Sequence, residues 1–112
     1  MHVGDLDGTA TAGDRGGRWN ADVVVTVHDG SEGPVSNVTV SGSWDAGGGG
    51  SCTTNGSGQC TVTKNNLKSN VGSVTFTVSD ITDTGGTYVY SSGSNHDPDG
   101  DSNGTSIQLS QL

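Results

Sequence analysis

The sequence has few basic residues. Its four are Arg15, Arg18, Lys64 and Lys68, against twelve acidic residues, and the formal net charge is −8. Nucleic acids and anionic membrane surfaces both bind basic protein surfaces, so neither is an expected partner. No apolar run approaches the roughly 20 residues of a membrane-spanning helix, and no signal-peptide pattern opens the chain. We therefore expect one domain taken from a larger polypeptide.

Large aliphatic residues are also scarce. Leu, Ile, Val and Phe make up 20 of the 112 residues, a share low enough to be compatible with disorder in a highly charged chain. Most of them are valines that alternate with threonine and serine, however, which is the pattern of β-strands. We expect residues 1–112 to fold as a single domain with a small core.

No segment has the period of a helix, whereas alternation predicts about seven strands. In the strongest of these, residues 19–29, Trp19 shares a face with a row of alternate apolar residues. In residues 35–44, Trp44 faces inward in the same way. The expected strands are residues 2–8, 19–29, 35–44, 59–64, 72–81, 88–90 and 105–109. Their number and spacing predict an all-β, antiparallel β-sandwich.

Cysteine is limited to Cys52 and Cys60, and turn-forming residues such as Asn55 and Gly56 lie between them. We expect a hairpin in which residues 59–64 pair back on the strand before the turn and the two sulfurs form a disulfide. Closing so short a loop contributes roughly 2–3 kcal/mol. A disulfide indicates an oxidising, extracellular compartment; the alternative is a reduced pair in the cytosol.

Three segments resemble a bacterial immunoglobulin-like domain of the Big type: Pro34–Val40 (PVSNVTV), Cys52–Thr63 (CTTNGSGQCTVT) and Val74–Val78 (VTFTV). The resemblance covers residues 19–81. It implies an immunoglobulin-like sandwich of the kind that recurs in large secreted or surface proteins.

The flanking residues 2–8 and 95–105 resemble modules at the C-terminal end of secreted bacterial hydrolases, which implies a location and not an activity. We expect a non-catalytic, monomeric accessory module of a larger secreted bacterial polypeptide, with an extracellular location and a role as spacer, stabiliser or adhesive domain.

Acidic and amide side chains alternate near the C-terminus, at Asp97, Asp99, Asp101 and Asn103. Counted from Asp99, this run matches the first half of the D-x-[DN]-x-[DN]-G calcium loop, with Gly104 at the turn and the Thr105 carbonyl as the next ligand. The twelfth position is Ser110, where an EF-hand carries glutamate. The pattern therefore predicts a Ca²⁺ site that lacks a carboxylate.

Asp5 and Asp7 are the expected donors of that missing ligand. They lie two residues apart on the first strand and so share one face. The first and last strands of an immunoglobulin-like sandwich often run close together, which predicts a calcium clasp that ties both termini. The alternative is a solvated acidic loop without a metal.

Other chemistry has less support in the sequence. No G-x-S-x-G motif is present and Glu32 is the single glutamate, so we do not expect an enzyme.

His2 and His28 would lie close together if the first two strands pair antiparallel. Such a pair can hold a transition metal, although histidines that hydrogen-bond loop backbone are the favoured interpretation.

A carbohydrate-binding module on the same fold is the alternative function, with a polysaccharide as partner. Exposed aromatic rings would form its stacking platform. Trp19 and Trp44 are expected in the core, which leaves Tyr88 and Tyr90, two residues apart on one face, as candidate sugar-stacking residues.

Overall fold

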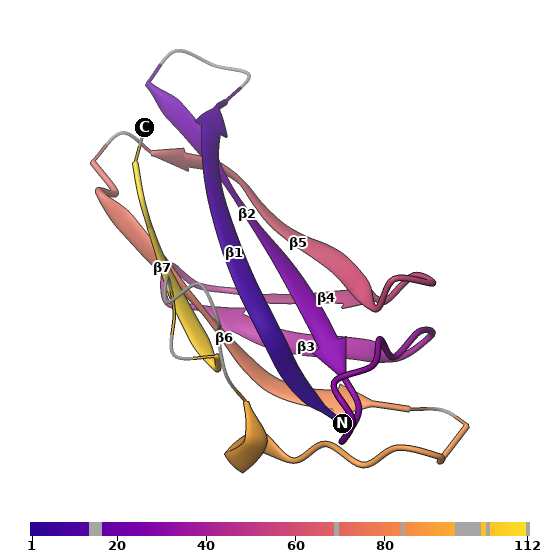
Figure 1. The fold of residues 1–112 in the computed structure, drawn as a ribbon. Helices are drawn as coiled ribbons and strands as arrows, with labels where there is room; N and C mark the ends of the chain where they lie inside the picture. The colour runs from indigo at the N-terminus through magenta and orange to yellow at the C-terminus, as the bar shows by residue number, and fades with distance from the viewer. Residues whose placement is uncertain (14–16, 69, 84, 96–101, 103, 112) are drawn as a thin grey trace.

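The computed structural model describes residues 1–13, 17–68, 70–83, 85–95, 102 and 104–111. Within them the chain forms two antiparallel sheets that pack face to face (Figure 1), which confirms the all-β sandwich. The strands are β1 (His2–Ala12), β2 (Arg18–His28), β3 (Thr39–Trp44), β4 (Gly49–Thr53), β5 (Gln59–Lys68), β6 (Ser73–Thr82) and β7 (Ser106–Ser110). One 3₁₀ turn, η1 (Ser92–Ser94), is the only helical element of the described residues.

The strand order is β1-β2-β5 in one sheet and β4-β3-β6-β7 in the other. An immunoglobulin constant-type domain has the same partition except that its fourth strand lies beside the fifth. Here β4 pairs with β3, and β5 pairs with β2. The expected hairpin is therefore wrong: a turn closed by the Asn55 N–H and the Gln59 carbonyl, 2.9 Å apart, carries the chain from one sheet to the other.

The expected disulfide between Cys52 and Cys60 is confirmed. Because Cys52 lies on β4 and Cys60 on β5, the bond joins the two sheets across the sandwich. Both cysteines pack against the edge of the hydrophobic core. The disulfide thus acts as a covalent link between layers.

The interior is formed by the predicted inward faces. Trp19 and Trp44 are buried, with 1% and 4% of their surface exposed, which confirms them as core residues. The Trp19 indole N–H donates to the Val71 carbonyl at 3.0 Å, and the Trp44 ring lies 4.9 Å from that of Phe76. The remaining core is mainly valine.

Irregularities in the β1–β2 and β3–β6 ladders change which residues face the core. In β1 the register shifts between Val3 and Asp5, which makes Gly4 an extra residue; Val3 and Leu6 are consequently both buried. In β6 a second shift makes Ser79 the extra residue. Such bulges move one part of a strand out of phase with the other.

Two expected strands differ from the structure. Residues 88–90 form no strand: the Val89 carbonyl accepts a hydrogen bond from the Met1 ammonium at 2.7 Å, and the Ser91 N–H donates to the Met1 carbonyl. The strand expected at 35–44 begins only at Thr39, because Asn37 adopts a left-handed φ of 60° that interrupts the extended backbone.

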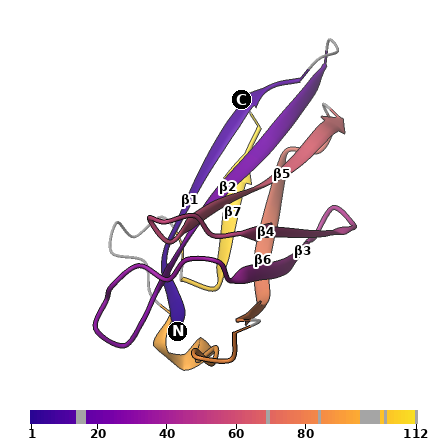
Figure 2. The same ribbon diagram turned by 90° about the vertical axis from the view of Figure 1, so that its right-hand side faces the viewer.

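The molecule is elongated, with principal extents of 45 × 26 × 21 Å (Figure 2). As expected, β1 lies beside the last strand: a side chain at Gly8 would contact Leu109 and Ile107 of β7. However, β1 begins at one end of the sandwich and β7 ends at the other. The two chain ends therefore lie apart, and the predicted clasp of Asp5 and Asp7 with residues 97–105 stays a prediction in which the metal would join β1 to the connection that leads into β7.

Candidate metal sites

Asp5 and Asp7 lie on β1, where both side chains are half-buried. Because Leu6 is buried and Gly8 faces β7, strand alternation places the two carboxylates on the outer face of the β1-β2-β5 sheet. Their neighbours on β2 are Thr26 and Val24. Carboxylate oxygens are the hard donors that Ca²⁺ prefers, so these two residues fit the predicted role of ligands.

The remaining predicted calcium ligands are described only in part. Asp97, Asp99, Asp101 and Asn103 lie outside the described residues. Thr105 is described, and its carbonyl accepts a hydrogen bond from the Val78 N–H at 2.8 Å. A carbonyl oxygen has two lone pairs, so the bond from Val78 leaves one of them for an ion. The role of the Thr105 carbonyl as a calcium ligand stays a prediction.

Asn95 directly precedes residues 96–104, the acidic segment, and is hydrogen-bonded to the start of β1. Its side-chain oxygen accepts a hydrogen bond from the Val3 N–H at 2.8 Å. Its amide nitrogen donates to the Tyr90 hydroxyl at 2.7 Å and to the Thr105 hydroxyl at 3.0 Å. The two residues that bracket 96–104 are therefore bonded to each other and held beside the start of β1.

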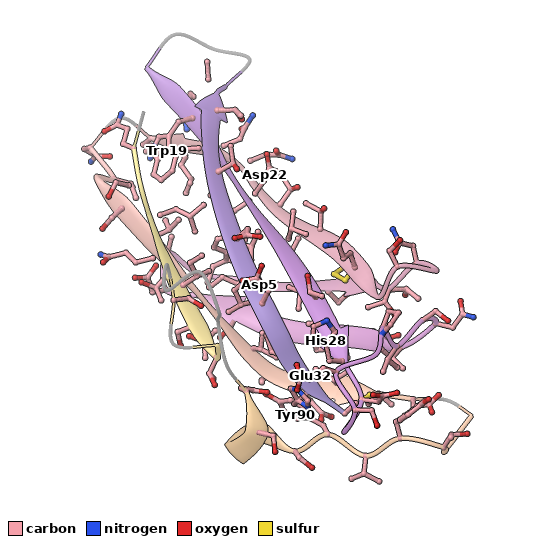
Figure 3. All side chains as sticks on the ribbon, in the orientation of Figure 1. Asp5, Trp19, Asp22, His28, Glu32 and Tyr90 are labelled. Carbon is pink, nitrogen blue, oxygen red and sulfur yellow. A yellow bond between two sulfur atoms is a disulfide. The ribbon has the colours of Figure 1, made fainter. Side chains whose placement is uncertain are left out.

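A second cluster of potential ligands lies where β1 begins. The pairing of β1 and β2 sets His2 opposite His28, and their ring centroids are 6.2 Å apart, edge to face. Glu32 joins them (Figure 3): its Oε1 lies 2.9 Å from His2 Nε2, and its Oε2 lies 3.0 Å from His28 Nδ1. One ligand atom from each of the three lies within 4.8 Å of the others.

The turn after β2 brings Glu32 back onto the histidines. The Asp29 carboxylate accepts hydrogen bonds from the backbone N–H groups of Gly33 and Ser31, at 2.9 and 2.8 Å. These bonds, with that from Gly33 the stronger influence, hold the pKa of Asp29 below its ordinary value of 3.8. Glu32 itself has a φ of 64°, a left-handed conformation that is uncommon outside glycine and reverses the chain.

Gly4 provides space for the His28 ring. A side chain at this position would overlap the ring, since its Cβ would lie 2.6 Å from His28 Cγ. The absence of a side chain at the bulge of β1 therefore lets the imidazole lie directly over the backbone. Solvent reaches the cluster from one side: the side chains of His2, His28 and Glu32 are 6%, 23% and 51% exposed.

The sequence predicted that His2 and His28 would lie close together, which the pairing of β1 with β2 confirms, but it favoured hydrogen bonds to loop backbone and missed Glu32 and Asn95. For Glu32 a signal was present, because the only glutamate of the chain lies four residues after His28, within the turn-forming run DGSEG. Asn95 carried no such signal, since its partner Val3 lies 92 residues away in the sequence.

The aromatic candidates for sugar stacking separate in the structure. Tyr88 is exposed, and Val89 beside it is 77% exposed. Tyr90 is half-buried, packs against the core and accepts the hydrogen bond from Asn95. Of the pair, Tyr88 alone is exposed as a stacking platform requires.

Comparison with known proteins finds no matching family model, no matching curated protein and no matching solved structure. Among the described residues no cavity opens, and no helix has the length and apolar character needed to cross a membrane. Function is therefore inferred from the residues of this chain.

Proposed function

We propose that this chain is a non-catalytic accessory module of a larger secreted bacterial protein, related to bacterial immunoglobulin-like domains, in which Ca²⁺ joins the start of β1 to the acidic segment before β7. The observation that carries the proposal is the link from Asn95 to Val3 and Thr105. It holds both ends of residues 96–104 next to the strand that bears Asp5 and Asp7.

The position of Asp5 along β1 supports a two-segment site. Val3, before it, is bonded to Asn95, and Gly8, after it, lies against Ile107 of β7. Asp5 thus lies between two points where β1 meets residues that flank the segment 96–104. Aspartates brought together at one site repel one another unless a cation is bound, and the net charge of −8 adds to this repulsion.

The secreted location is supported by the disulfide. Cys52 and Cys60 are bonded between the two sheets, and such bonds persist in oxidising compartments. The small valine-rich core is the kind that gains most from covalent and metal cross-links. A stabilised spacer or adhesive module fits these properties.

Thermal unfolding with calcium, and then with excess chelator, tests the metal. Ligand that binds only the folded state at about 100 times its Kd stabilises it by about 2.7 kcal/mol, so we expect calcium to raise Tm and the chelator to reverse the rise. An unchanged Tm would contradict the calcium proposal.

The double variant Asp5→Asn/Asp7→Asn tests whether β1 contributes ligands. We expect weaker calcium binding by isothermal titration. Asp22→Asn/Asp80→Asn, which changes the net charge equally at sites on β2 and β6, is the matched control and should bind as the parent does. Equal affinity in both double variants would mean that the acidic segment binds calcium without β1.

A carbohydrate-binding module remains the second candidate, favoured by the exposed Tyr88 and Val89. Retention on insoluble polysaccharide that is lost in Tyr88→Ala would support it. Tyr90→Ala is a poor test, because the Tyr90 hydroxyl also binds Asn95.

A further inference from the structure

We propose that His2, His28 and Glu32 form a binding site for a divalent transition-metal ion, with Zn²⁺ as the best match. The site lies at the end of the sandwich where β1 begins, and its donors differ from those of the proposed calcium site. It therefore goes beyond the structural role proposed above.

The donor set points to the class of metal. Two imidazole nitrogens and one carboxylate oxygen are the ligands of many zinc sites that keep a fourth position for water or substrate. Calcium instead takes six to eight oxygen ligands. The histidines therefore select zinc or a neighbouring transition metal over calcium.

The geometry needs only a small adjustment. Tetrahedral zinc with ligands at about 2.0–2.2 Å places neighbouring ligand atoms about 3.3 Å apart. In the structure each nitrogen lies 2.9–3.0 Å from a Glu32 oxygen. The two contacting pairs would open by a few tenths of an ångström, and the other ligand atoms, which lie within 4.8 Å of one another, would close toward the same spacing.

Hydrogen bonds of the backbone hold the segments that carry the three ligands. His2 and His28 are partners in the β1–β2 ladder, and the Asp29 turn returns Glu32 to them. Gly4, which has no side chain, leaves room for the His28 ring against β1. Ligands whose positions are set in advance by the surrounding structure lose less entropy on binding.

The exposed fractions of the three side chains would shield a bound ion on one side and leave it accessible to solvent on the other. His2 is 6% exposed and Glu32 51%, so an ion would be covered on the His2 side and reached from the Glu32 side. The net charge of −8 attracts cations to the molecule as a whole.

Zinc titration of the untagged chain in excess calcium tests the site, because a polyhistidine tag would bind the same metal. We expect one zinc ion per chain and a rise in Tm that calcium does not reproduce. Glu32→Gln and His28→Ala should each weaken zinc binding by about tenfold or more, the scale on which metal sites respond to lost interactions. Absence of saturable binding would overturn the proposal.

A matched control separates this site from weak surface binding. Asp45→Asn removes one exposed carboxylate, as Glu32→Gln does, and should bind zinc as the parent does. If it lowers the affinity as much as Glu32→Gln, the ion is bound elsewhere and the proposal fails.

The ¹⁵N chemical shifts of the imidazole nitrogens distinguish metal binding from a merely structural role, which would leave these shifts unchanged on zinc titration. Zinc on Nε2 of His2 and Nδ1 of His28 leaves the proton on Nδ1 of His2 and on Nε2 of His28. We expect only the two metal-bound nitrogens to shift on titration. Unshifted nitrogens would overturn the proposal even if zinc binds the chain, and loss of the calcium response in Asp5→Asn/Asp7→Asn would leave it intact.

Discussion

Gly42 shows how closely single residues are packed between the two sheets. It lies on β3, and a Cβ there would meet the Thr77 carbonyl and lie 2.5 Å from the Phe76 ring. Phe76 in turn packs on Trp44. The lack of a side chain at Gly42 therefore leaves room for the Phe76 ring that packs on Trp44.

Replacing Gly42 with alanine should destabilise the fold. The added methyl group meets backbone as well as the ring, and overpacking of this kind typically costs about 1–3 kcal/mol. Urea unfolding measures the loss. Gly56→Ala is the control, because a Cβ at that turn position has no neighbour within 4 Å; equal midpoints for the two variants would contradict the packing account.

At the scale of elements, the connection after β2 is ordered by one carboxylate. Asp29 accepts two backbone N–H groups, and its pKa is lowered chiefly by the bond from Gly33. A group whose pKa is lower in the folded state stabilises that state above its unfolded pKa, and this contribution disappears as the pH falls through the folded value.

The variant Asp29→Asn should therefore be less stable than the parent at neutral pH, and the difference should shrink as the pH falls below 3.8, the ordinary pKa of the group. Protonation then makes the parent carboxyl resemble the uncharged amide. Thermal unfolding of both proteins across this range gives the comparison. A difference that stays constant or grows on acidification would contradict the assignment.

Strands were predicted well where the alternation of apolar and polar residues defines them. They were predicted less well where a hydrogen-bond partner distant in the sequence determines the backbone conformation. The inward row that begins at Trp19 follows from alternation alone. Residues 88–90 also alternate, yet their backbone is bonded to Met1 instead of a strand ladder. The bulge at Gly4 likewise depends on the register with β2, which alternation within β1 does not encode.

At the scale of the whole molecule, the disulfide connects the two layers. Each sheet is held by its own ladders, and Cys52 and Cys60 supply the covalent bond between β4 and β5. Loss of this bond opens the loop between Cys52 and Cys60 in the unfolded chain, which raises the conformational entropy of the unfolded state.

The double variant Cys52→Ala/Cys60→Ala should lose roughly 2–3 kcal/mol of stability, the amount expected for a loop of this length. Urea unfolding with and without reductant measures the loss. The parent should weaken on reduction, and the double variant should not respond. A parent whose midpoint is unaffected by full reduction would show that the link contributes nothing.

The sequence by itself determined the β-class, the faces of the main strands, the disulfide partners and the shared face of Asp5 and Asp7. These follow from the two-residue period of a strand and from there being two cysteines. The calcium role of Asp97, Asp99, Asp101 and Asn103 stays a prediction, since these residues lie outside the described part of the chain.

Only the tertiary structure decided which sheet receives β4, where β1 meets the β6–β7 connection, and that Glu32 closes on His2 and His28. Each depends on hydrogen bonds between distant residues, such as Asn95 with Val3, or on a left-handed residue such as Glu32. Local pattern does not encode such partners, because the free energy that selects them comes from packing the two sheets together.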